Sequence, residues 1–117
     1  MDYYHIWCDI QSGTQDLAFA RAVRQYLEHL KAQDLLAGFR VTRRKLGFGP
    51  EGLGEFHIII ETEGLAQLEE AFQQVARRSG ETEQYHRQVF EKVRAVRFGL
   101  YRDFPDVVRE DQGADPG

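Results

Sequence analysis

The stretch that decides the fold of this 117-residue chain runs from Phe39 to Glu61. It reads Phe-Arg-Val-Thr-Arg-Arg-Lys-Leu, then Gly-Phe-Gly-Pro-Glu-Gly-Leu, then Gly-Glu-Phe-His-Ile-Ile-Ile-Glu. Apolar and polar residues alternate in both arms, and alternate side chains of a β-strand point to opposite faces of a sheet. The stretch therefore predicts two strands joined by a long, glycine-rich loop. One face of this pair belongs to a core, and the other gathers cations, carboxylates and a histidine.

Helix and strand patterns lie on both sides of this stretch. Residues 3–10 alternate as in a half-buried strand, and apolar residues recur at helical spacing over 17–30. Two further helices are predicted over 65–75 and 82–90, and alternation returns over 93–101. The main order is strand, helix, strand, strand, helix, strand, which is the split βαβ arrangement of ferredoxin-like α+β domains.

This order determines the predicted sheet. Right-handed crossovers put the first and third strands in the centre of an antiparallel sheet with the order 4-1-3-2, and the second strand at an edge. We predict one ferredoxin-like βαββαβ domain over residues 1–109 and a disordered tail over 110–117, which has no large apolar residue. The helices cover one face, toward which the third helix turns Val89 and Phe90. The strand residues predicted on that face are Ile6, Cys8, Val41, Phe56, Ile58, Ile60, Val96, Phe98 and Leu100.

The opposite sheet face has a mixed character. Its predicted residues are His5, Trp7, Asp9, Arg40, Thr42, Arg44, Glu55, His57, Ile59, Glu61, Arg97 and Tyr101. This set is too polar for a buried core, yet Trp7, Ile59 and Tyr101 are rather apolar for a surface fully in water. Such a face suits a sheet that packs on a second copy of itself around a partly wet cavity. We therefore expect a homodimer.

Composition narrows the classes of function. The net charge of -4 gives no support for a general nucleic-acid or membrane-surface partner. The single cysteine, Cys8, excludes an intrachain disulfide framework and fits a reducing compartment. No apolar run approaches the ~20 residues that cross a bilayer, and the N-terminus shows no signal-peptide pattern. We expect a cytoplasmic protein without a nucleic-acid or membrane partner.

Four segments resemble a known family. They are His-Ile-Trp-Cys-Asp-Ile from His5, Thr-Arg-Arg-Lys-Leu-Gly-Phe-Gly-Pro from Thr42, Gly-Leu-Gly-Glu-Phe-His from Gly52, and Arg-Phe-Gly-Leu-Tyr-Arg-Asp-Phe-Pro-Asp from Arg97. Up to Arg109 the chain is similar to a small bacterial family of uncharacterised ferredoxin-like proteins, whose broader relatives are the dimeric α+β barrels. The resemblance implies a homodimer whose two sheets face each other. In the broad superfamily, cofactor-independent monooxygenases, isomerases, haem-dependent enzymes and regulatory ligand-binding domains share that cavity. The resemblance therefore assigns no catalytic residue here.

His5 and His57 are the candidate catalytic residues. Both are predicted on the polar face of neighbouring strands, where they can act as acid and base. With Glu55, Glu61 or Asp9 nearby they can also bind a metal. The alternative is that both histidines hydrogen-bond carboxylates inside a dimer cavity. Because the sequence has no His-x-His or His-x-x-x-His spacing, we expect no metal and no cofactor.

The same face carries candidate ligand-binding residues. These are Trp7, Arg44, Glu55, Arg97 and Tyr101. Arg44, together with Arg40, can hold a carboxylate or phosphate through a forked guanidinium; equally, basic residues on an edge strand discourage edge pairing. Trp7 and Tyr101 can stack on an aromatic ligand or fill the dimer interface. The glycine-rich loop lacks the Gly-Lys-Ser/Thr ending of a nucleotide-binding loop, and it can be a flap over the cavity or a plain hairpin loop.

Three functions compete on these observations. The first is a homodimer with a cavity for a small, anionic organic molecule, held on the polar sheet face between the two sheets or else between the sheet and the helices, and neutralised by Arg44 or Arg97. If that protein is an enzyme, its chemistry is cofactor-independent acid/base chemistry in which His57 or His5 moves a proton. The second is a non-enzymatic interaction or regulatory domain whose polar sheet face is only the dimer seam. RNA binding is disfavoured, because the third strand lacks the aromatic doublet on which RNA-recognition motifs stack bases.

Overall fold

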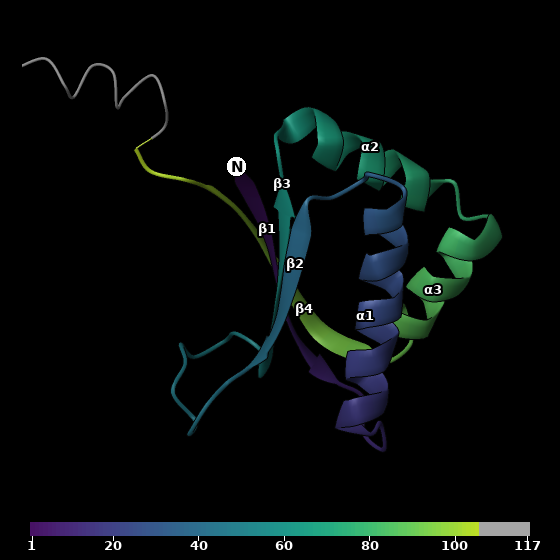
Figure 1. Cartoon of the computed structure of the whole chain (residues 1–117). Coiled ribbons are helices and arrows are strands. Elements are labelled where there is room, and N and C mark those ends of the chain that lie inside the picture. The colour runs from purple at the N-terminus through teal and green to yellow at the C-terminus, as the bar shows by residue number, and fades with distance from the viewer. Residues whose placement is uncertain (106–117) are drawn as a thin grey trace, which may run out of the picture.

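The computed structural model describes residues 1–105 and shows a sheet covered on one side by helices (Figure 1). In chain order the elements are β1 (Asp2–Ile10), α1 (Asp16–Ala32), β2 (Gly38–Arg43), β3 (Phe56–Thr62), α2 (Leu65–Ala76), α3 (Gly80–Phe90) and β4 (Val93–Arg102). The tail predicted over 110–117 and the domain end predicted at residue 109 lie outside the described residues.

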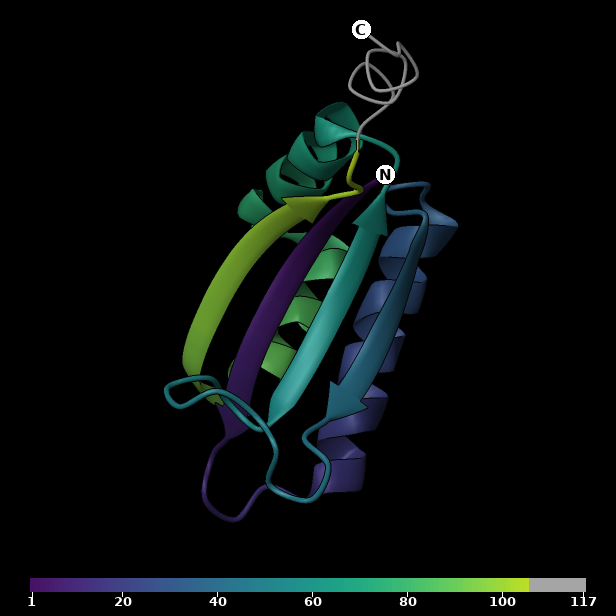
Figure 2. The same ribbon diagram turned by 90° about the vertical axis from the view of Figure 1, so that its left-hand side faces the viewer.

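The sheet has the predicted topology. Its strands pair antiparallel in the order β2-β3-β1-β4, so that β1 and β3 are central and β2 lies at an edge (Figure 2). In the register of the two central strands, Trp7 lies opposite His57 and Cys8 lies opposite Phe56. The ferredoxin-like α+β fold is thereby confirmed, and the alternation places Trp7 and His57 on the sheet face that the helices leave open.

The core lies between the sheet and α1. Phe19, Val23 and Leu27 recur at helical spacing and are each no more than 2% exposed. The ring of Phe19 meets that of Phe56 edge-on, with centroids 5.0 Å apart. Full burial of one such side chain contributes about 1.5–3 kcal/mol. Cys8 belongs to this core, and burial raises the pKa of its thiol to about 11, as expected for an inert thiol.

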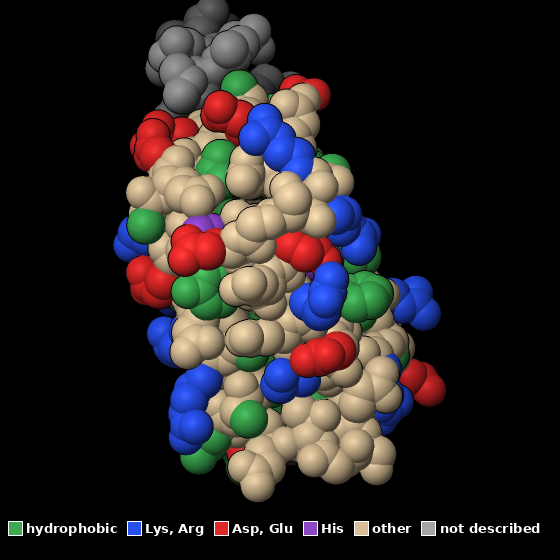
Figure 3. Space-filling view, turned by 90° about the vertical axis from the view of Figure 1, so that its right-hand side faces the viewer, with side chains coloured by type: hydrophobic (Ala, Val, Ile, Leu, Met, Phe, Trp, Pro, Cys, Tyr) green, Lys and Arg blue, Asp and Glu red, His purple; other side chains and the backbone are tan. Residues whose placement is uncertain are grey.

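The helices turn a polar surface to solvent. Figure 3 shows Lys, Arg, Asp and Glu side chains interspersed over the helix side of the molecule. Within residues 1–105, no helix combines the length and the apolar character needed to cross a membrane.

Strand β4 differs from the prediction. Its pairing with β1 shifts between Trp7 and Asp9, and Ala95 takes a positive φ of 54°, which marks a bulge. Phe98 and Leu100 were predicted core residues, but they are 61% and 52% exposed. Phe90, predicted to turn inward from α3, is 64% exposed. These burial predictions are wrong because α3 packs mainly on α1, and the helices do not close over β4.

Candidate functional site

Two histidines meet on the open face of the sheet. His5 lies on β1 and His57 on β3, and the Nδ1 atom of His5 is 2.8 Å from the Nε2 atom of His57. They are diagonal neighbours, because the register sets His57 opposite Trp7 and His5 opposite Ile59. One ring donates the hydrogen bond and the other accepts it. The structure thus brings the two candidate catalytic residues together. Among the described residues they bond each other, not a carboxylate.

Aromatic rings flank this pair on both sides. The indole of Trp7 stacks on His57 with centroids 4.7 Å apart and planes 14° apart, and Tyr101 meets His5 edge-on at 4.7 Å. Gly99 lies beneath the row, opposite His5. A Cβ atom at position 99 would approach the rings of Tyr101 and Trp7 at 3.1 and 3.3 Å. The glycine therefore makes room for the row of rings.

The environment of the two imidazoles favours their neutral forms. Burial lowers the pKa of His5 below its ordinary value. Burial also lowers the pKa of His57, and a charge on His5 lowers it further. Because a charge on one ring opposes a charge on the other, the pair takes up its second proton less readily than its first. It can therefore hold or pass one proton.

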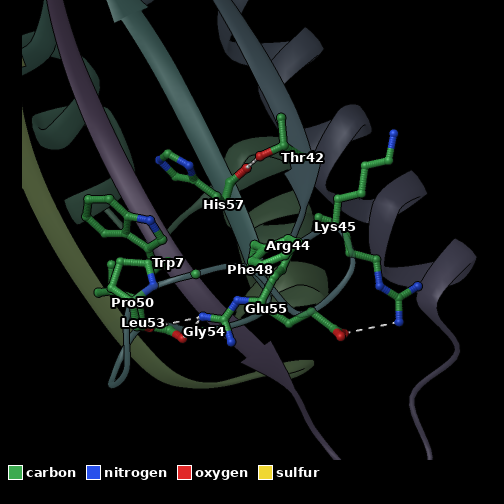
Figure 4. A pocket seen from close by; sticks show the side chains of 12 residues that line it. Trp7, Thr42, Arg44, Lys45, Phe48, Pro50, Leu53, Gly54, Glu55 and His57 are labelled. Carbon is green, nitrogen blue, oxygen red and sulfur yellow. Dashed lines mark hydrogen bonds and ion pairs between the residues drawn. The ribbon is translucent and has the colours of Figure 1, made fainter.

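A cavity of about 260 Å³ adjoins the Trp7–His57 stack (Figure 4). Its walls come from β1, from the β2 and β3 ends, and from the glycine-rich loop between them. The lining residues are Trp7, Thr42, Arg43, Arg44, Lys45, Phe48, Gly49, Pro50, Leu53, Gly54, Glu55 and His57. Figures 1 and 2 show this loop projecting from the sheet face opposite the helices and crossing the lower end of that face. Three predicted ligand-binding residues, Trp7, Arg44 and Glu55, thus border one space.

Arg44 makes hydrogen bonds to the glycine-rich loop that the sequence did not predict. Its Nη2 atom donates to the carbonyl oxygens of Leu53, at 2.7 Å, and Pro50, at 3.2 Å. Gly49 lies against the guanidinium, where a Cβ atom would collide with it. Arg44 therefore fastens the loop to the end of β2, and its fork is not fully available to an external anion.

Glu55 takes part in a network that the sequence analysis missed. Arg43 donates from Nη1 to Asp16 at 2.9 Å and from Nη2 to Glu55 at 3.1 Å, and it lies over the ring of Phe56. Arg43 continues the row of odd-numbered β2 residues that face the helices. This alternation in β2, together with the acidic Asp16 at the start of α1, could have predicted the ion pair between Arg43 and Asp16. Glu55 is therefore held by a cation on the rim and does not reach the imidazoles.

Arg97 and Tyr101 lie on the same face but outside the cavity. Arg97 pairs with Trp7 across β1 and β4, and its side chain is exposed. Over residues 1–105 no group of three His, Cys, Asp or Glu side chains is arranged to hold a metal ion. The structure thus places Trp7 and His57, with His5, at the centre of the predicted site, Arg44 and Glu55 on the rim of the adjoining cavity, and Arg97 and Tyr101 outside it.

Comparison with known proteins places the chain in a family. A family model described as "Family of unknown function (DUF6614)" matches residues 1–114. No curated protein matches the chain significantly.

Several solved structures share the fold. The crystal structure of At3g17210 from Arabidopsis thaliana has a TM-score of 0.70 at 9% identity, covering 91% of this chain and 98% of that one. A dimeric ferredoxin-like protein of unknown function from Jannaschia sp. CCS1 gives 0.63 at 11% identity, covering 87% and 98%. A dimeric protein of unknown function and ferredoxin-like fold from Bacteroides fragilis NCTC 9343 gives 0.54 at 9%, covering 87% and 95%. At these identities the likeness shows the fold alone.

Proposed function

Because the chain belongs to DUF6614, a family of unknown function, we propose a function from the geometry of its open sheet face. The protein is a homodimer that binds a small, anionic organic molecule on this face, beside His57 and Trp7. The observation that carries the proposal is the cavity of about 260 Å³ under the glycine-rich loop, bordered by the Trp7–His57 stack and by cations. A cytoplasmic location fits the single free cysteine, Cys8.

The charges around the cavity favour an anion. Arg44 and Lys45 border it, and within residues 1–105 the ammonium of Lys45 has no ion-pair partner. Arg44 is partly occupied by the loop carbonyls, but a guanidinium carries five N–H donors, and some remain for a ligand. The nearby carboxylate of Glu55 is paired with Arg43. Among the lining residues, the cations Arg43, Arg44 and Lys45 therefore outnumber the single carboxylate of Glu55.

The histidines supply the chemistry of the proposed site. The His5–His57 pair exchanges one proton with a bound molecule, and Trp7 supplies an apolar wall against which a flat ligand lies. Tyr101 and Arg97 extend the same face outward, as an aromatic wall and a second cation. An enzyme built on this site performs acid/base chemistry with its own side chains.

The dimer follows from the character of the face. Trp7, His5, His57 and Ile59 are only partly buried, and together they form a mixed apolar and polar surface at the centre of the sheet. Two structural neighbours are described as dimeric. Packing two such faces together removes the rings from water and encloses the cavity.

One observation favours a second candidate, a non-enzymatic interaction or regulatory domain. The rings of Trp7, His57, His5 and Tyr101 already form a continuous row, and Arg44 has donors committed to the loop. In that case the open face is only the seam of the dimer, without space for a ligand.

A thermal-shift screen against organic acids and inorganic phosphate separates the two candidates. We expect a stabilising anion whose effect falls in Arg44→Lys and in His57→Gln. Arg24→Lys, a matched change on the exposed side of α1, should leave it intact. A ligand that stabilises all four proteins equally places the site elsewhere. No stabilising ligand at all favours the seam.

A further inference from the structure

A second and larger space lies on the other side of the sheet. A cavity of about 470 Å³ separates the sheet from the helices and reaches β4, where the helices leave the strand uncovered. Its depth reaches core residues such as Cys8, Leu27 and Leu30, which are at most 3% exposed. This volume falls within the range of small-molecule sites, about 300–1,000 Å³. We call this space the apolar chamber.

Aromatic rings form the mouth of the apolar chamber. Tyr4 meets Phe72 edge-on with centroids 5.2 Å apart and stacks on Phe98 at 5.7 Å. Phe72, Phe98 and Phe90 border the chamber and are 48%, 61% and 64% exposed. Three large rings left in water at one opening form an apolar patch of the kind that marks a binding site.

A small cluster of polar side chains lies on the side of the chamber formed by α1 and α3. Tyr26 and His86 line it with their rings 5.7 Å apart, and His86 Nδ1 lies 3.9 Å from Glu83 Oε2. Within residues 1–105, this buried Glu83 oxygen and the Tyr26 hydroxyl have no hydrogen-bond partner. Burial raises the pKa of Tyr26, and the negative charges of Glu83 and of ionised Tyr4 raise it further. The Tyr26 hydroxyl therefore stays protonated and can donate a hydrogen bond.

The chemistry of the lining selects the occupant. Among residues 1–105, no Lys or Arg side chain lines the apolar chamber, and the carboxylate of Glu83 lies near His86, so an anion would be buried there without compensation. A flat ring system finds aromatic faces at the mouth, and one ligand oxygen finds the donor of Tyr26. A protein segment would cover the mouth but not fill the depth between the layers.

We propose that the apolar chamber binds a neutral, ring-containing small molecule with one hydrogen-bonding oxygen, such as a phenol or a cyclic ketone. Its rings lie among Tyr4, Phe72 and Phe98, and its oxygen accepts a hydrogen bond from Tyr26. This site is separate from the anion site on the open face, since the sheet lies between them.

The test uses the whole chain with 2-naphthol as the probe and naphthalene as the same ring system without oxygen. Binding is measured by calorimetry and by the methyl NMR shifts of the core. Ala71→Phe fills the chamber, Val96→Phe fills it from the sheet side, and Ala66→Phe places the same ring on the exposed side of α2. Tyr26→Phe removes only the hydroxyl, and Tyr101→Phe does the same on the open face. Circular dichroism reports which variants are folded.

We expect folded filling variants to lose binding of both probes, and Ala66→Phe to keep it. Tyr26→Phe should weaken 2-naphthol by about three- to tenfold, the effect of one hydrogen bond, and leave naphthalene unchanged. Tyr101→Phe, Arg44→Lys and His57→Gln should bind both probes normally, so this proposal and the anion site succeed or fail separately. No binding up to the solubility limit, or binding insensitive to the filling variants, overturns the proposal. The proposal is also overturned if Phe98→Glu converts a dimer into a monomer, because that result would mean that a second copy of the chain covers the mouth of the chamber.

Discussion

At the scale of single residues, the burial of His5 and His57 beside each other sets how the open face responds to pH. The two rings lie 2.8 Å apart, and burial lowers the pKa of each below its ordinary value of about 6.5. A group whose pKa is lower in the folded chain binds more protons when unfolded. Its contribution to stability is fully present above the unfolded pKa and is lost as pH falls through the folded pKa.

The first prediction follows from that sign. The wild-type protein should unfold at lower denaturant concentration near about pH 5 than near about pH 7.5, and His57→Gln should reduce this difference. Denaturant titrations at both pH values measure it, with Gln25→Ala on the exposed side of α1 as control. Equal pH dependence in wild type and His57→Gln would contradict the linkage.

A second prediction concerns Gly54, which approaches the backbone of β1 so closely that a Cβ atom would collide with the carbonyl of Cys8. Backbone cannot yield as a flexible side chain does, so Gly54→Ala should destabilise the fold by about 1–3 kcal/mol. Gly64→Ala is the matched change, since its Cβ meets open space and its φ is extended. Its effect should stay within about 0.5 kcal/mol. Similar losses in both variants would show that the contact with Cys8 is unimportant.

At the scale of elements, the sequence predicted the strand faces, which depend on a regular alternation of residues. It did not predict the bulge in β4 or the exposure of that strand, which depend on how the elements pack. Alternation placed His5, Trp7 and His57 on one face because β1 and β3 pair without interruption. It could not reveal the bulge at Ala95, since a bulge is one extra residue that leaves no mark in a short strand pattern. The exposure of Phe98 depends on how far α2 and α3 reach over β4, which no local pattern encodes.

The loop is the element whose role was least predictable. A guanidinium can serve an external anion or nearby carbonyls, and the choice depends on the loop conformation, in which Leu46, Gly47 and Gly52 have positive φ. The structure gives Arg44 to the carbonyls of Pro50 and Leu53. The sequence therefore placed Arg44 on the same side of the sheet as Trp7 and His57, but it could not show which groups the guanidinium binds.

The third prediction tests these hydrogen bonds of Arg44. Lysine keeps the charge of Arg44 but has no planar fork to bind both carbonyls, so Arg44→Lys should loosen the loop. Hydrogen exchange of residues 47–54 should accelerate, while the free energy of unfolding changes by less than about 1 kcal/mol. Lys45→Arg, on the neighbouring exposed residue, should leave the exchange of the loop unchanged. An unaltered loop in Arg44→Lys would mean that these hydrogen bonds do not hold it.

At the scale of the whole molecule, the two faces of the sheet have different surroundings. One face meets α1 and encloses the core and the apolar chamber, and the other exposes a row of rings around His5 and His57. At one edge of the sheet, β2 carries the exposed side chains of Arg40 and Arg43. Such charges oppose the pairing of this edge with the edge of another sheet. Association through the open face is thus the arrangement that these surfaces favour.

The last prediction tests this association. Ile59 lies at the centre of the open face, opposite His5 on one side and Arg40 on the other. A carboxylate there would lose its water when two such faces pack together, a cost that the neighbouring Arg40 offsets only in part, whereas in a monomer the carboxylate stays in water. Ile59→Glu should therefore halve the mass measured by light scattering at micromolar concentration and leave the circular dichroism spectrum unchanged. Phe98→Glu puts the same charge on the opposite side of the sheet and should remain dimeric. A wild-type chain that is only monomeric, or a dimer that survives Ile59→Glu, would exclude this face as the interface.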